Sequence, residues 1–285
     1  MYSGVFIVCD GYLCFDVLGF LREIDKKISR AVIWTAGGAA SLIVFLKCLG
    51  FTYDQMVSKL QTLSCLPNII YGGSLEPGTS VNIKREIAEW MMNVINGTKL
   101  FSQDTTMKDI YKLTNIFPNI ITSGCSMNPK THGDTPIIDV ILTSMCNIGT
   151  YSSHSIGDVE YNSFTKYDPY PVYRETNLGD VTPKTLYIGN YSRLFDNNIY
   201  SVFDGIENRL IQEYFDRVLK RVKGSKIVLN NQFVMINGIF SKNDITHHDI
   251  MQRLRNGKDH CDKFKKEEDT LFYMDEIIAK IKNQS

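Results

Sequence analysis

The chain has 285 residues with 31 basic and 31 acidic side chains, so its formal net charge is zero. This length suits one large domain or two small ones, and the balanced charge argues against a dedicated nucleic-acid binder, because duplex binding relies on clustered basic side chains. The seven cysteines include no CxxC pair, which favours a reducing compartment over a disulfide framework. We therefore expect a cytoplasmic protein.

The N-terminal segment is interpreted as the first strand. No apolar run reaches the roughly 18 residues that a membrane-spanning helix needs, so no transmembrane segment is expected. The first residues, MYSGVFIVCDGYLCFD, lack the basic start of a signal peptide and meet an acid at Asp10.

Strand and helix patterns alternate over the N-terminal part. Val5 to Cys9 is a short apolar run, typical of a strand that is buried on both faces. The next elements are expected as a helix over 13–28, a strand over 31–34, an apolar helix over 38–49 and a helix from the N-cap Thr52 to Leu63. This order predicts a parallel sheet with right-handed crossovers.

The remainder of the chain is less regular. The segment 66–80 is rich in glycine and proline and is predicted to be a loop. Helices are expected over 82–95, over 136–147 after the cap Thr135, and over 206–223, strands over 119–122 and 184–189, and a charged helical tail over 249–285. We predict one α/β domain, with a core over 1–200 and a helical and strand extension over 201–285 packed on it.

The second strand and the helix after it meet at WTAGG, residues 34–38. In a GxSxG turn, a strained backbone exposes the central serine, and the flanking glycines keep space around it. Here Trp34 and Gly38 occupy the outer positions and Ala36 the centre. The frame of a nucleophile turn is present, but the nucleophile is absent.

Around this turn the chain resembles the patatin-like phospholipases. VFIVCDGYLCFDVLGFLREID is similar to the family's first strand, glycine-rich loop and helix, and VIWTAGGAASLIVFLKCLGFTYDQM to its GTSAGA turn and the LGY or LGF segment that follows. Later segments resemble the family's next strand, its helix, its DGG or DGA region and its SLGTG strand: NIFPNIITSG, DTPIIDVILTSMCNIGTYSS, IGDVEYNSFTKYDPYPV and KTLYIGNYS. The resemblance covers most of residues 4–192. It implies a three-layer α/β sandwich, with a mainly parallel central sheet and helices on both faces.

The resemblance also places the family's catalytic positions on altered residues. Those enzymes use a serine–aspartate dyad, and here the serine position is Ala36, which has no atom able to attack an acyl carbon. The aspartate position is Asn162, or Tyr161 with a one-residue slip, and an asparagine cannot act as a general base. The oxyanion loop keeps one glycine among its positions Asp10, Gly11, Tyr12 and Leu13. Engineering for crystallisation would not replace the loop glycines or introduce Trp34, so we interpret these losses as natural.

Other polar residues near the turn have simpler interpretations. Thr35 and Ser41 are expected to cap helices or to bond to helix backbone. Cys9 and Cys14 bracket the loop and could offer a thiol, although cysteines without a disulfide are more often inert core residues.

Two further clusters are weighed in the same way. The only metal-like cluster is interpreted as solvated polar residues of the tail, because adjacent histidines on a helix point to different sides; it comprises His247, His248, His260 and Cys261. An aromatic segment around 161–173 either packs over the vacated site or lines a ligand site, and its tyrosines are at 151, 161, 167, 170 and 173.

Two functions stay open. The leading one is a catalytically inactive patatin-like protein, a pseudoenzyme that uses the fold to bind a lipid or acyl ligand, a protein partner or a second copy of the chain in a regulatory or structural role. The alternative is a divergent lipid acyl hydrolase or phospholipase whose nucleophile has moved. No cofactor or metal is expected. The Asn-, Ile-, Lys- and Tyr-rich composition points to an AT-rich genome, such as that of a large DNA virus or a protist.

Overall fold

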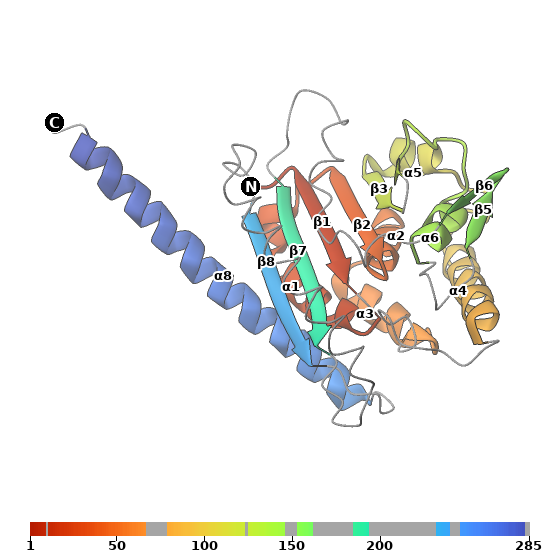
Figure 1. Ribbon diagram of the computed structural model, residues 1–285, viewed down its shortest axis with the longest axis horizontal. Coiled ribbons are helices and arrows are strands. Elements are labelled where there is room, and N and C mark those ends of the chain that lie inside the picture. The colour runs from red at the N-terminus through yellow and green to blue at the C-terminus, as the bar shows by residue number, and fades with distance from the viewer. Residues whose placement is uncertain are drawn as a thin grey trace, which may run out of the picture.

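The computed structural model describes residues 1–9, 11–66, 79–122, 125–145, 153–161, 185–193, 232–239 and 246–282. These residues form a six-stranded sheet in the order β4-β3-β2-β1-β7-β8 and a two-stranded hairpin of β5 and β6 (Figure 1). The strands are β1 (Gly4–Cys9), β2 (Ile33–Gly38), β3 (Phe117–Ile121), β4 (Ser126–Met127), β5 (His154–Ile156), β6 (Val159–Tyr161), β7 (Thr185–Arg193) and β8 (Gln232–Ile239). Only the β3–β4 pair of the large sheet is antiparallel, among the described strands. The predicted α/β class with a mainly parallel central sheet is confirmed.

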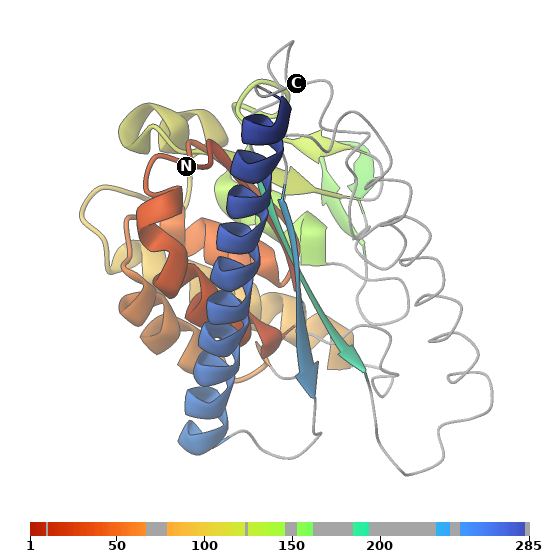
Figure 2. The same cartoon turned by 90° about the vertical axis from the view of Figure 1, so that its left-hand side faces the viewer.

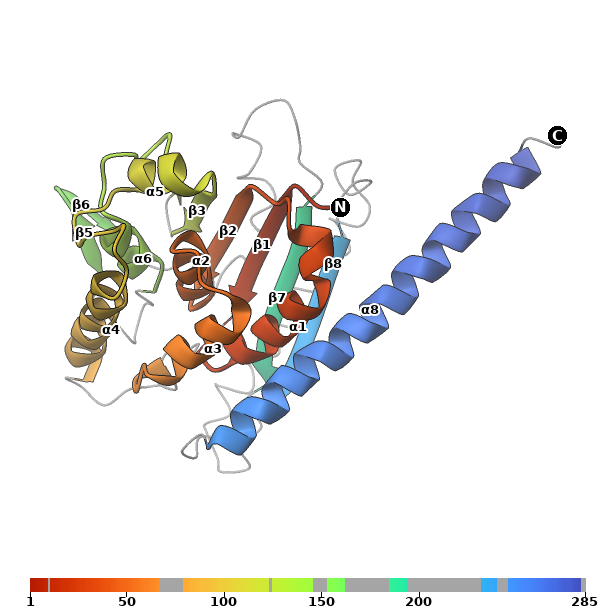
Figure 3. The ribbon, with the colours of Figure 1, turned by 180° about the vertical axis from the view of Figure 1, so that it is seen from behind.

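Four of the described helices lie together on one face of the sheet. The helices are α1 (Leu13–Ile28), α2 (Ala40–Cys48), α3 (Tyr53–Gln61), α4 (Thr79–Asn96), α5 (Met107–Thr114), α6 (Ile137–Met145) and α8 (His247–Lys282). Seen from behind, α1, α2, α3 and α8 stand in front of the strands, while α4 and α6 lie beside the β5–β6 hairpin (Figure 3). The sheet face and these helices enclose the core.

The strands β1 and β2 are central and adjacent, as predicted. Residue by residue, Gly4 of β1 pairs with Ile33 of β2, and the register continues to Cys9 and Gly38. All six residues of β1 are buried, which explains the uninterrupted apolar run: parallel strands in such a sheet are covered on both faces. The apolar helix α2 is also almost wholly buried.

Three helices begin at a threonine whose hydroxyl caps the backbone. Thr52 accepts a hydrogen bond from the backbone N–H of Gln55 at 3.3 Å, and the Gln55 side chain accepts from the Thr52 N–H at 2.9 Å. The same reciprocal pattern joins Thr106 to Asp109 at α5 and Thr246 to Asp249 at α8. Such boxes satisfy backbone donors that the first helical turn leaves without partners.

The long helix α8 crosses α1 at very close range. A Cβ added to Gly19 would collide with the carbonyl of Leu254, and one added to Gly257 would collide with the carbonyl of Asp16. Only glycine allows the two backbones to approach this closely. Figure 2 shows α8 from its outer side, running past β7 and β8.

The α1–α8 crossing also contains a buried ion pair. The Asp16 carboxylate is 1% exposed and accepts from the Arg253 guanidinium at 3.0 Å and from the Asn256 amide at 2.6 Å. Burial raises the pKa of Asp16, against the opposing effect of Arg253. The C-terminal part of the described chain thus contributes the edge strand β8 to the sheet and packs the helix α8 against α1. The predicted domain boundary at residue 200 lies outside the described residues and stays a prediction.

Several other elements predicted from the sequence are present in the structure with slightly different bounds. The helix expected over 13–28 is confirmed, and the helix expected over 38–49 is shorter at both ends. The helix expected over 136–147 begins at Ile137 and is described as far as Met145. The helix α5 and the hairpin β5–β6 were not predicted. The expected helix over 206–223 and most of the loop over 66–80 lie outside the described residues.

Candidate functional site

The turn between β2 and α2 lies two residues later than the sequence pattern suggested. Ala36 belongs to β2, where it pairs with Ile7 on one side and Ile120 on the other. The strand continues to Gly38, whose φ of 62° is in the left-handed region, and α2 begins at Ala40. Pairing with β1 keeps the chain extended up to Gly38, and glycine adopts the left-handed conformation without steric cost. The expected turn at Ala36 is therefore corrected to Gly38.

Trp34 consequently lies near the start of β2 and away from the turn. Its ring is 1% exposed, and its indole N–H donates to the Ala31 carbonyl at 3.0 Å. The Lys47 ammonium lies 5.2 Å from the centre of this ring. These contacts give Trp34 a place in the core at the strand's beginning.

Neither Ala36 in the strand nor Gly38 at the turn has a side chain able to attack an acyl carbon. Ala36 is fully buried and carries only a methyl group, and Gly38 has no side chain at all. The nearest hydroxyl in the strand, Thr35, is 1% exposed and accepts from the Asn119 amide at 3.3 Å. The structure thus gives Thr35 a partner on the neighbouring strand β3, where the sequence had suggested a helix cap.

Beneath the turn, two buried serines form a chain of hydrogen bonds. Ser41 donates to the Gly38 carbonyl at 2.6 Å, and Ser144 of α6 donates to Ser41 at 2.8 Å. Both serines are fully buried. The interpretation of Ser41 as a hydroxyl that bonds to nearby backbone is confirmed, and the chain ties α6 to the start of α2. Nothing in the sequence pattern marked Ser144.

The segment after β1 faces the same turn. Cys9 ends β1 directly opposite Gly38, Gly11 has a φ of 35°, and Tyr12 precedes α1 without a side-chain cap. Tyr12 is 9% and Leu13 is 1% exposed, so the loop carries apolar side chains packed into the core. Asp10 lies outside the described residues.

Two thiols lie at this junction. The Cys9 and Cys14 sulfurs are 3.4 Å apart, and the Cys14 thiol donates to the Ala39 carbonyl at 3.5 Å. Both side chains are fully buried. The end of β1, the first turn of α1 and the start of α2 therefore meet at these two sulfur atoms.

A second buried polar network lies on β2, β3 and β4. The Asn119 side chain is fully buried, and besides donating to Thr35 it accepts from the Asn128 amide at 3.3 Å and from the Ser126 hydroxyl. Buried amides cost free energy unless their hydrogen bonds are made, so these contacts hold the strand ends in one arrangement. Asn119 lies in the strand-like segment of the sequence but was not singled out there.

The region expected to contain the base position begins at the β5–β6 hairpin. Tyr161 ends β6 and pairs with His154 of β5, while Asn162 lies outside the described residues. The centres of the Tyr161 and His132 rings are 6.3 Å apart. The pKa of Tyr161 is raised, mainly by burial. The other tyrosines of the aromatic segment are not among the described residues. The proximity of Asn162 to the turn stays a prediction.

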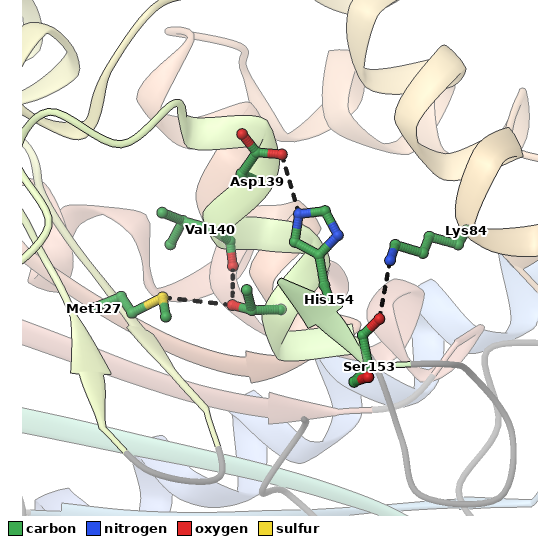
Figure 4. A network of polar contacts seen from close by, with 7 residues as sticks. Lys84, Met127, Asp139, Val140, Ser153 and His154 are labelled. Atoms are coloured by element: carbon green, nitrogen blue, oxygen red, sulfur yellow. Dashed lines mark hydrogen bonds and ion pairs between the residues drawn. The ribbon is translucent and has the colours of Figure 1, made fainter. Parts of the chain in front are cut away.

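The hairpin is held to α4 and α6 by polar contacts (Figure 4). The His154 Nε2 atom is 3.0 Å from Asp139 Oδ1, and the Lys84 ammonium donates to the Ser153 carbonyl at 3.1 Å. Within α6, the Thr143 hydroxyl donates to the Val140 carbonyl at 2.7 Å. A carboxylate within hydrogen-bond distance of an imidazole orients the ring, as in acid–base sites. The sequence offered no signal for this pair.

The histidine-rich tail residues lie on α8. His247 and His248 are exposed in its first turn, whereas Cys261 is fully buried and burial lowers the pKa of His260. Within the described part of the chain, no three His, Cys, Asp or Glu side chains are grouped so that they could hold a metal ion. Likewise, none of the described helices has the length and apolar composition needed to cross a membrane.

Comparison with known proteins identifies the fold. No protein-family model and no curated protein sequence matches the chain. Among solved structures, VipD from Legionella pneumophila matches with a TM-score of 0.53 at 9% identity, over 92% of this chain and 66% of VipD. The type III effector ExoU matches with a TM-score of 0.44 at 11% identity, over 92% of this chain and 53% of ExoU. A structure of ExoU with SpcU from Pseudomonas aeruginosa gives 0.45, over 93% of this chain and 51% of that chain.

The match to VipD establishes the class of fold. The described residues have the patatin-like α/β fold, with a mainly parallel central sheet and the β2–α2 turn at its carboxyl end. At 9% identity, the likeness extends to the fold and no further. The chain spans less than two thirds of VipD's length and about half of ExoU's.

Proposed function

We propose that this protein is a catalytically inactive patatin-like protein. The observation that carries the proposal is the β2–α2 turn, where Gly38 takes the left-handed position and Ala36 lies buried in the strand. A serine hydrolase needs a hydroxyl exposed at this point, with a base beside it. The nearby hydroxyls of Thr35 and Ser41 are buried and already hydrogen-bonded to the protein.

The predicted changes at the other catalytic positions support the same conclusion. The base position falls on Asn162 in the resemblance, and an amide cannot accept the proton of a hydroxyl nucleophile. The loop after β1 keeps Gly11 but places the apolar Tyr12 and Leu13 in the core. Stabilising an oxyanion requires donors aimed into the reacting space, and a loop filled with packed side chains is poorly suited to this.

The retained fold then serves binding. We propose a lipid or acyl ligand as the chemical class, since an apolar chain suits the acyl-binding region that the resemblance implies near the 161–173 segment. A regulatory or structural role, with a protein partner or a second copy of the chain, belongs to the same proposal. The six described cysteines form no disulfide, which supports a cytoplasmic location.

The test is a series of variants that restores the missing groups. Wild type, Ala36→Ser, Gly38→Ser, and Gly38→Ser with Asn162→Asp are purified and assayed with p-nitrophenyl butyrate and with phospholipid vesicles. Loss of a nucleophile removes roughly 10⁶-fold of the chemical rate, and partial repair of a catalytic unit recovers little. We expect no protein of the series to exceed the background rate. Wild-type turnover that survives purification and is lost on changing Thr35, Cys9 or Cys14 would overturn the proposal.

Binding of a fluorescent fatty-acid analogue tests the lipid part separately. Saturable binding to wild type, competed by unlabelled fatty acid, is expected for a lipid-binding role. Absence of saturable binding would remove the lipid ligand and leave the regulatory or structural role.

One observation favours the alternative, a divergent acyl hydrolase with a moved nucleophile. The His154–Asp139 pair has the arrangement of an oriented general base, with the Asp139 side chain 42% and the His154 side chain 14% exposed. If the chain does turn over esters, His154→Ala should abolish that turnover while Lys84→Ala leaves it intact. Equal rates in both variants would remove this support.

A further inference from the structure

Cys9 and Cys14 are the two described cysteines whose sulfur atoms are in direct contact. Their Sγ atoms lie 3.4 Å apart, and a disulfide bond is about 2.05 Å long, so the sulfurs need to approach by roughly 1.4 Å. Cys9 is the last residue of β1, and Cys14 lies in the first turn of α1. Forming the bond therefore requires the beginning of α1 to move toward the end of β1.

The position of the pair gives it a structural consequence. Cys9 pairs in register with Gly38, and the Cys14 thiol contacts the Ala39 carbonyl at 3.5 Å. A bond between the two sulfurs would tie the start of α1 to the end of β1 directly beside the β2–α2 turn. Its formation would therefore restrain the chain between the two cysteines.

We propose that Cys9 and Cys14 are a redox-sensitive thiol pair that a peroxide converts to an intramolecular disulfide. In the first step, one sulfur attacks a peroxide oxygen, the O–O bond breaks, and a sulfenic acid and water form. In the second step, the other sulfur attacks the sulfenic sulfur, the S–O bond breaks, and a second water leaves. Two thiols are oxidised by two electrons, and one hydrogen peroxide is reduced to two waters. The proposal is independent of the function proposed above.

Burial makes the pair slow to react but selective. Both thiols are fully buried, so oxidation proceeds through local opening of the structure. A sulfenic acid formed on either cysteine then has the other thiol within contact distance.

The other buried cysteines provide internal controls. Burial raises the pKa of Cys65 to about 12 and also raises the pKa of Cys48, which keeps both thiols protonated.

Peptide mapping of the full chain tests the proposal. Reduced protein is treated with hydrogen peroxide under native conditions, alkylated in denaturant and digested. Trypsin releases 1–22 as one peptide that holds both cysteines, because Arg22 is the first basic residue. Its mass should fall by two hydrogens, it should resist alkylation, and chymotryptic cleavage after Tyr12 should leave two linked fragments. Cys48 and Cys65 should remain alkylatable in the same sample.

Single Cys→Ser variants test whether the disulfide joins Cys9 to Cys14 specifically. Cys9→Ser and Cys14→Ser should each abolish the linked fragments, whereas Cys48→Ser should retain them. Phenylarsine oxide, which bridges neighbouring thiols, should bind wild type and Cys48→Ser but neither single variant of the pair, and this readout needs no oxidant. Alkylation of both Cys9 and Cys14 after peroxide treatment would overturn the proposal. So would oxidation of either to a sulfinic acid without linkage.

Discussion

At the residue scale, the proposed loss of activity rests on Gly38 at the β2–α2 turn and on Ala36 in the strand before it. Gly38 has the left-handed backbone, and Ala36 is a fully buried strand residue between Ile7 and Ile120. A hydroxyl introduced at Ala36 would therefore lie in the interior of the sheet and not in front of a substrate. A serine introduced at Ala36, the position that the sequence pattern indicates, would lie within β2, two residues before the turn at Gly38.

This arrangement predicts that Ala36→Ser lowers stability. A buried hydroxyl without a hydrogen-bond partner costs about 1–3 kcal/mol. The control Ala88→Ser lies at a partly exposed helix position and should cost about 0.5 kcal/mol through helix propensity. Urea unfolding of wild type and both variants measures the difference. Equal losses would mean that the Ala36 position is not buried as described.

The hydrogen bond between Thr35 and Asn119 gives a second residue-scale prediction. Thr35→Val keeps the shape of the side chain and removes the acceptor, leaving the buried Asn119 amide one bond short. We expect a loss of about 1–2 kcal/mol in the free energy of unfolding, while Thr35→Ser, which keeps the hydroxyl, should cost less. A double-mutant cycle checks the contact itself. When Asn119→Leu has already removed the amide, adding Thr35→Val should lower the free energy of unfolding by less than it does in wild type. Strict additivity would contradict the described contact.

At the scale of elements, the crossing of α1 and α8 depends on two glycines. Gly257→Ala should separate the helices, because its Cβ would overlap the Asp16 carbonyl, and overpacking of this kind costs about 1–3 kcal/mol or more. The control Gly97→Ala meets its nearest atom, the Val94 carbonyl oxygen, at 3.4 Å and should change stability by less than about 1 kcal/mol. Thermal or urea unfolding distinguishes the two. Similar stabilities would show that α8 does not pack on α1 at this point.

The buried Asp16 carboxyl makes the same interface sensitive to pH. Burial raises its pKa in the folded protein, with Arg253 and Asn256 opposing, so the folded chain binds the proton more tightly than the unfolded chain. Its contribution to stability is therefore complete below the unfolded pKa of about 3.9 and is lost as the pH rises through the folded pKa. The free energy of unfolding of wild type minus that of Asp16→Asn should fall from pH 4 to pH 7. A difference that grows with pH would mean that the Arg253 ion pair outweighs burial.

Much of this element order could be predicted from the sequence. The buried strand β1 appears as an uninterrupted apolar run, and the apolar run over 31–34 overlaps the start of β2. The helix α1 has a clear helical period, so the types and adjacency of these elements followed from local patterns. The capping boxes Thr106-x-x-Asp109 and Thr246-x-x-Asp249 were readable signals for helix starts that the prediction did not use.

The geometry of the site could not be predicted in the same way. The end of β2 depends on its pairing with β1, and that register is a long-range property. The contacts of Asn119 with Thr35, of Ser144 with Ser41, and of His154 with Asp139 join segments that the sequence pattern does not relate. The pair of glycines at 37–38 was the one local signal that the turn could lie beyond Ala36.

At the scale of the whole molecule, a patatin-like sheet is combined with a turn that carries no nucleophile. The sheet order, the parallel strands and the likeness to VipD define the fold. The buried hydroxyls, the packed loop after β1 and the small residues at the turn support a protein that uses this fold without acyl transfer.

Labelling with a fluorophosphonate tests this central claim most directly. The oxygen of an activated serine attacks the phosphorus atom of the reagent, fluoride leaves, and a phosphonate ester forms, regardless of the ester that an enzyme prefers. Purified full-length protein is incubated with excess reagent beside an active serine hydrolase as a positive control, and the intact mass of each is measured. We predict an unchanged mass for this protein under conditions that fully label the control. A single stoichiometric adduct, absent after heat denaturation and mapped to one serine, would contradict the account and establish a catalytic nucleophile elsewhere in the chain.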